Sequence, residues 1–148
     1  MAATLHDILL EPDVQPQVVE DCCNLIQHEV SEASGISGTA VKVAYKTVTT
    51  FMPGHVRYMV GSLLPDMVDK MEPYWAEFAS SGGGDFGDYL SKHGDEVSEA
   101  LLSVTDARAE ASERPTIIKA YRAVRGGAVK NVESALPRVG ELVLKYAG

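Results

Sequence analysis

The sequence has few aromatic residues, few cysteines and no long apolar segment. Only 7% of its 148 residues are aromatic, and it contains two cysteines and one tryptophan. Its longest run without Asp, Glu, Lys or Arg extends over ten residues, from Thr47 to Val56, whereas a membrane-spanning helix requires ~18. We therefore expect no membrane span.

The first ten residues contain no Lys or Arg and include Asp7. Secretory signals and transit peptides carry basic residues near the N-terminus, so we expect neither and predict a cytoplasmic location. Cys22 and Cys23 are adjacent in a predicted helix, where their side chains point about 100° apart. We predict that they form no disulfide and lie buried as small apolar residues in a reducing compartment.

Basic residues are also in the minority, with 13 Lys and Arg against 21 Asp and Glu and a net charge of -8. This balance argues against nucleic-acid binding, which requires a basic surface. Residues 105–148 are locally basic, with 8 Lys or Arg and 5 Asp or Glu. They form either a site for an anion or an acidic partner, or a solvated face that complements the acidic remainder within the fold or across a dimer. The candidate partner-binding residues are Lys119, Arg125 and Lys130, with Arg122 beside them.

Apolar residues recur at helical spacing along nearly the whole chain, and no segment shows the alternation of a strand. We predict a single all-α domain over residues 1–148. About eight helices are expected, at residues 4–10, from Asp13 to Gly35, from Ser37 or Thr39 to Phe51, and at 56–79, 85–92, 95–112, 115–125 and 127–147. Thr4 is expected to cap the first helix, and Pro65 and Pro73 to kink the fourth.

Two of these helices have predicted buried stripes that can be checked directly. In the second helix the stripe is Val19, Cys23, Ile26, Val30 and Ala33. In the third helix it is Val41, Ala44, Tyr45, Val48 and Phe51. The single Trp75 is expected to anchor the core, and its placement on the surface as a binding residue is the alternative.

The second half of the chain resembles the first, which predicts an internal duplication. Residues 44–48 match 120–124, and residues 60–65 match 132–137, each in the same helix order. The predicted halves are residues 4–79 and 85–147, joined by the Ser/Gly connector at 80–84. Neither half has a large core of its own, so we expect them to pack around a pseudo-twofold axis into one domain.

Several short sequences resemble catalytic or metal-binding motifs but lack the neighbouring elements or residues that those motifs require. Residues 82–87 spell GxGxxG, but no strand precedes them. His28-Glu29 has no second His, and no His follows a Glu by three residues. We predict no metal site and no cofactor. Asp66, Asp69 and Glu72 share one helical face, and we favour a solvated acidic surface over a cation site.

The candidate ligand-binding residues are two paired tyrosines and the cation that follows each of them: Tyr45 with Lys46, and Tyr121 with Arg122. Two tyrosines and two cations near a symmetry axis would suit a small anionic or amphipathic ligand. In the alternative interpretation each tyrosine is a core residue whose hydroxyl reaches the surface. Met52, Met59, Met67 and Met71 cluster in the first half, and methionine adapts to lipid-like guests as well as to ordinary cores.

Longer segments resemble a family of small helical bacterial proteins without an assigned function. The resemblance rests on the segments TAVKVAYK from Thr39, LLP from Leu63, FGDYL from Phe86, ALLSVTDARAE from Ala100 and ALPRVG from Ala135. It covers nearly the whole chain. It implies a helical fold, but no activity, cofactor or site residue.

The sequence contains no nucleophile and base at a characteristic spacing and no metal-ligand pattern. We therefore predict that the protein is not an enzyme. The first functional hypothesis is a binding or self-association module, in which acidic and basic surfaces complement each other. The alternative is a carrier of a small amphipathic or anionic ligand, with a pocket between the two halves.

Overall fold

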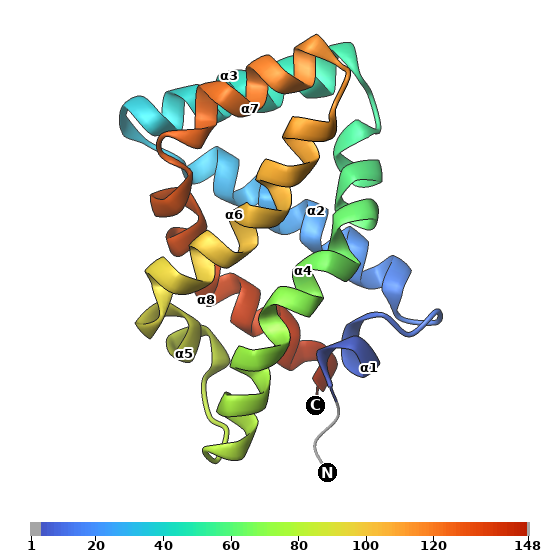
Figure 1. Cartoon of the computed structure of the whole chain (residues 1–148), viewed down its shortest axis with the longest axis vertical. Coiled ribbons are helices and arrows are strands. Elements are labelled where there is room, and N and C mark those ends of the chain that lie inside the picture. The colour runs from blue at the N-terminus through green and yellow to red at the C-terminus, as the bar shows by residue number, and fades with distance from the viewer. Residues whose placement is uncertain (1–3, 148) are drawn as a thin grey trace.

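The structure, a computed structural model, describes residues 4–147, apart from the side chain of Ser37. This part of the chain forms one all-α domain of eight helices and no strand (Figure 1). The helices are α1 (Leu5–Leu9), α2 (Gln15–Glu32), α3 (Gly35–Phe51), α4 (His55–Ser80), α5 (Phe86–Lys92), α6 (Gly94–Ala111), α7 (Pro115–Arg125) and α8 (Ala128–Ala147). The predicted fold class and helix order are confirmed.

The two short helices begin in the same way. The Thr4 hydroxyl accepts a hydrogen bond from the Asp7 amide at 3.1 Å, and the Asp85 carboxylate accepts one from the Asp88 amide at 3.0 Å. Each side chain satisfies an amide that has no partner within the first helical turn. The predicted cap at Thr4 is confirmed.

Helix α4 continues through Pro65 and Pro73, and α8 continues through Pro137. None of these prolines begins a helix. The turn between α4 and α5 instead contains Gly82, Gly83 and Gly84, all with positive φ, a conformation that glycine adopts without steric cost. This turn reverses the chain between the two halves.

The core lies toward the end of the molecule where α4, α5 and α8 meet (Figure 1). Phe86 is fully buried there, with its ring centroid 5.0 Å from that of Trp75 and 4.9 Å from that of Phe78. Trp75 is therefore a core residue, as predicted. Helix α5 approaches α8 so closely that a Cβ on Gly140 would overlap the backbone of Gly87.

Helices α3 and α7 lie side by side, antiparallel, across the opposite end of the molecule (Figure 1). Among the described side chains of these two helices none is fully buried, and the buried residue of α3 is Gly38. Phe51, predicted on the buried stripe of the third helix, is 74% exposed. The other four residues of that stripe, Val41, Ala44, Tyr45 and Val48, are half-buried.

Two other predicted details differ. The third helix begins at Gly35, earlier than expected, because Ser34 provides the extended residue that precedes it. The predicted stripe of α2 is half-buried along its length, and the fully buried side chain of α2 is Val18. Helical spacing therefore overestimates the burial of these residues.

The helix contacts have the same pattern in both halves. Helix α1 contacts α4 and α8, as does α5, and α2 and α6 each contact both α4 and α8. Helices α3 and α7 contact each other. The two long helices α4 and α8 thus hold the other elements together.

Candidate functional site

An open groove of about 890 Å³ lies between the two halves. We call it the inter-half groove. Its walls are the turn between α3 and α4, the first turns of α4, the C-terminal part of α6 and the start of α7. Its large apolar lining residues include Phe51, Met52, Met59, Leu63 and Ile117, together with the ring of Tyr58. This volume falls within the range of small-molecule sites.

His55 is a polar group of the groove with an unused hydrogen-bonding atom. Its Nε2 is buried and has no hydrogen-bond partner. Burial lowers the pKa of His55, and the nearby Arg114 lowers it further. The imidazole is thus mainly neutral at neutral pH, and its Nε2 is a buried polar atom at the groove wall without a hydrogen-bond partner.

Arg108 joins the two halves at the wall of the groove. Its guanidinium donates to the Ser62 hydroxyl at 2.5 Å and to the Ser62 carbonyl at 3.0 Å, and it lies 3.7 Å from the Asp66 carboxylate. These contacts fix one cationic group beside the apolar lining. Arg114 is a second, exposed cation of the groove, and Glu113 is the one acidic residue among the lining residues.

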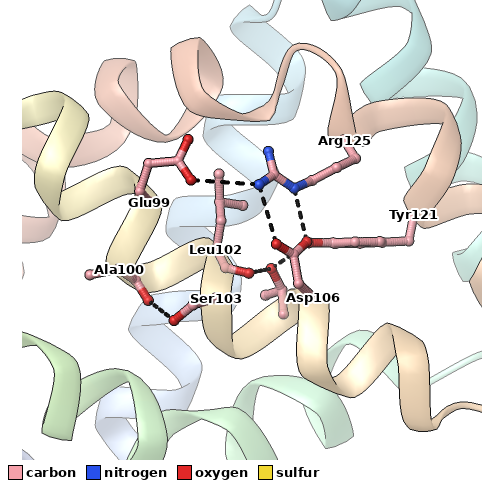
Figure 2. Close-up of polar contacts among 8 residues, drawn as sticks. Glu99, Ala100, Leu102, Ser103, Asp106, Tyr121 and Arg125 are labelled. Carbon is pink, nitrogen blue, oxygen red and sulfur yellow. Dashed lines mark hydrogen bonds and ion pairs between the residues drawn. The ribbon is translucent and has the colours of Figure 1, made fainter.

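Tyr121 also lines the groove, and its hydroxyl belongs to a polar cluster between α6 and α7 (Figure 2). It donates a short hydrogen bond to Asp106 and lies 2.8 Å from the Thr105 hydroxyl. Arg125 donates to both oxygens of Asp106, at 2.8 and 3.2 Å, and lies 3.7 Å from Glu99. This bidentate geometry makes the pair more specific than a single contact.

The hydrogen bonds of this cluster shift the protonation of its members. Arg125 first, and then Tyr121, holds the pKa of Asp106 below its usual range. Burial, reinforced by Asp106, raises the pKa of Tyr121. The carboxylate is therefore charged and the phenol neutral at neutral pH. The cluster holds α7 against α6. Both carboxylate oxygens of Asp106 are engaged in it, so Asp106 is not free to act as a base.

The structure separates the four predicted ligand-binding residues. Tyr121 lines the groove, but Tyr45, Lys46 and Arg122 do not. Tyr45 is half-buried on α3, and Lys46 and Arg122 are exposed. Of the predicted partner-binding residues, Lys119 and Lys130 are exposed, whereas Arg125 is committed to Asp106.

The four clustered methionines are also divided. Met52 and Met59 line the groove, while Met71 is buried in the core and Met67 packs against it. Sequence reasoning missed His55, Arg108 and Arg114 as groove residues. No local motif marks them, since α6 and the turn before α4 are about fifty positions apart in the chain.

Other predicted chemistry has a structural explanation. Glu72 accepts a hydrogen bond from the His6 amide at 2.8 Å, and Asp66 lies near Arg108. Among the residues that the structure describes, no three His, Cys, Asp or Glu side chains are arranged to hold a metal ion. Burial raises the pKa of Cys22 to about 12 and also raises that of Cys23, so neither is a thiolate at neutral pH.

The matching family model is DUF6918, a family of unknown function, and it covers residues 5–147. The chain belongs to this family. No curated protein and no solved structure matches it. Membership of DUF6918 agrees with the resemblance seen in the sequence, and it brings no assigned site. Within residues 4–147, no helix of this DUF6918 chain is both long and apolar enough to cross a membrane.

Proposed function

We propose that the protein is a non-enzymatic binding protein, and that the inter-half groove takes a small amphipathic anion. The observation that carries this proposal is the composition of the groove. An apolar lining that includes Met52, Met59 and Leu63 lies beside His55, Arg108 and Arg114. An apolar chain with an anionic head group satisfies both parts.

The cationic side of the groove sets the orientation of the ligand. Arg108 and Arg114 provide charge-assisted donors for a carboxylate or phosphate, and His55 adds its unpartnered Nε2. The apolar tail would then lie along Met59, Leu63 and Ile117, away from solvent. Glu113 at the same rim disfavours a second anionic group on the ligand.

Dodecanoate, below its micelle concentration, is a suitable probe for this groove. We expect it to raise the melting temperature of the protein, and its methyl ester to do so much less. Arg114→Ala should weaken dodecanoate binding about tenfold or more, in line with a lost hydrogen bond to a charged group. Lys70→Ala is the matched control, because Lys70 is an exposed cation that does not line the groove.

Histidine NMR gives a second readout of the same site. A bound carboxylate favours the protonated imidazole, so dodecanoate should raise the pKa of His55 and leave the ring resonances of His28 unchanged. His28 pairs with Glu32 on α2, outside the groove. Equal shifts at both histidines, or an equal loss of affinity in Arg114→Ala and Lys70→Ala, would contradict the proposal.

We also propose that the chain arose by internal duplication of a four-helix unit. The matching helix order, the matching contacts of the two halves with α4 and α8, and the caps at Thr4 and Asp85 support it. In an experimental structure, residues 4–79 should superpose on 85–147 in helix order and direction. Pro65 should then fall on Pro137 and Tyr45 on Tyr121, and a different order would contradict the duplication.

A further inference from the structure

The outer face of α3 exposes large apolar side chains. Ile36 is 93% exposed, Val43 61% and Phe51 74%. They are spaced seven and eight positions apart, which places them on one side of a helix about 25 Å long. Tyr58, 69% exposed, follows at the start of α4. Within the described residues, these are the strongly exposed large apolar side chains, and they all lie at this end of the molecule.

A second hollow, of about 320 Å³, lies beside this row between α3 and α7. Val43, Thr47 and Phe51 line it from α3, and Lys119 and Ala120 line it from α7. We call this surface, the exposed row and the hollow together, the α3–α7 face. It is apolar across both helices and continues into the inter-half groove at Phe51, which lines both hollows.

Helices α3 and α7 together carry a net positive charge, opposite in sign to the net charge of the whole protein. Helices α3 and α7 contain five Lys or Arg and no Asp or Glu, although the chain has a net charge of -8. Arg125 is paired with Asp106. The other four cations, Lys42, Lys46, Lys119 and Arg122, are exposed and form no ion pair in the part of the chain that the structure describes. The α3–α7 face therefore has unpaired positive charge beside exposed apolar side chains.

A second copy of the chain does not suit this face. In a symmetric dimer the same surface meets itself, so the unpaired cations of α3 and α7 would be brought together. In a head-to-tail contact the acidic remainder would supply charge, but the strongly exposed apolar side chains are all on the basic side. The occupant must therefore be both anionic and apolar.

We propose that the α3–α7 face docks onto the surface of an anionic lipid bilayer. Ile36, Val43 and Phe51 would enter the boundary between head groups and acyl chains, as the apolar face of an interfacial helix does. Lys46, Lys119 and Arg122 would contact the anionic head groups. Protruding side chains spread along one helix, with cations on its flanks and no carboxylate, fit a fluid charged surface better than a shaped protein pocket.

The acidic residues of the molecule do not prevent this contact. They all lie outside α3 and α7, although Glu113 stands two residues before α7, and those farther than about 10 Å from the bilayer are largely screened at 0.1 M salt. The docking proposal concerns the outer face of α3 and α7, which shares Phe51 with the inter-half groove but not His55, Arg108 or Arg114. Either proposal can fail without the other.

Vesicle co-sedimentation tests the docking face. The wild-type protein should sediment with vesicles of equal parts phosphatidylglycerol and phosphatidylcholine, less in high salt, and not with phosphatidylcholine alone. Phe51→Ser should lower the partition coefficient about tenfold. Lys119→Glu should lower it at least fivefold. Lys70→Glu is the matched control, since Lys70 is an exposed cation on α4 away from this face, and it should sediment like the wild type.

Circular dichroism melts check that each variant is folded. Both variants should fold, because Phe51 and Lys119 are exposed. Three results would overturn the proposal. One is that the wild-type protein does not sediment with the anionic vesicles. Another is an equal loss in Lys119→Glu and Lys70→Glu, which would reveal an effect of net charge alone. The third is a dimer in light scattering that Phe51→Ser dissociates, without vesicle binding, which would assign the face to self-association.

Discussion

The two ends of the molecule use apolar side chains in opposite ways. At one end, Phe86 is fully buried among Trp75 and Phe78, and α5 lies against α8 with backbone in contact. At the other end, none of the described side chains of α3 and α7 is fully buried, and Phe51 faces solvent. Burial of apolar surface is the main source of stability. We infer that the first end stabilises the fold and that the second is available for binding.

A matched pair of phenylalanine substitutions sharpens this comparison most. Phe86→Ala should lower the free energy of unfolding by about 3–5 kcal/mol, because it removes a buried ring and leaves a cavity. Phe51→Ala should change it by less than about 0.5 kcal/mol, as expected for an exposed residue. Urea unfolding followed by circular dichroism measures both. Similar losses in the two variants would mean that the α3–α7 layer is as much a part of the core as α5.

A pair of glycine substitutions tests the close contact at the core end. An added methyl group at Gly140 would overlap the Gly87 backbone, so Gly140→Ala should destabilise the protein by about 3 kcal/mol, at the upper end of overpacking effects. At Gly61 the nearest atom is 4.0 Å from the new Cβ. Gly61→Ala in α4 should therefore stabilise by about 0.5–1 kcal/mol through helix propensity. A tolerated Gly140→Ala in thermal melts would show that α5 can move away from α8.

The Asp106 cluster is the main polar attachment of α7 to α6, and its effect should be smaller. Asp106→Asn should cost about 1 kcal/mol at pH 7, because Asp106 and Arg125 are partly solvated. Since the pKa of Asp106 is lowered in the fold, its carboxylate stabilises the protein above the unfolded-state pKa. This contribution is lost as the pH falls through the folded-state value.

Urea unfolding of the wild type and Asp106→Asn at pH 7 and near pH 2 follows this dependence. The difference in stability between the two proteins should shrink at the lower pH. Lys92 and Asp88, an exposed pair within α5, provide a control in Asp88→Asn, which should have almost no effect at pH 7. A difference between wild type and Asp106→Asn that is independent of pH would mean that the carboxylate charge does not hold α7.

The sequence was sufficient for the class of the fold, because helical spacing, the cap at Thr4 and the breaks near Gly35 and Pro53 are local signals. It was misleading for α3, which carries apolar residues on two sides. Val43 and Phe51 lie on one side and Tyr45 on the other, so periodicity alone does not determine which side faces the core. The contact with α7 covers part of α3 and leaves Val43 and Phe51 exposed, and this contact is not encoded in the spacing within α3.

The candidate site could not be predicted from residue spacing, because it is formed by contacts between helices that are distant in the sequence. Symmetry between the halves pointed to Lys46 and Arg122, whereas the groove places Arg108 and Arg114 beside His55. These residues come together because α6 ends next to the turn that precedes α4. Arg125 was expected on an open basic patch, but it is bound to Asp106 of α6.

Native-state hydrogen exchange of the free protein tests the difference between the two ends most directly. Amides of core helices open only with the free energy of global unfolding, whereas weakly packed elements open locally at lower cost. We predict that the amides in the middle of α3 and α7 exchange through openings of clearly lower free energy than those around Val68 in α4 and Val143 in α8. Equal opening free energies in all four helices would contradict this account, because the α3–α7 layer would then belong to the cooperative core.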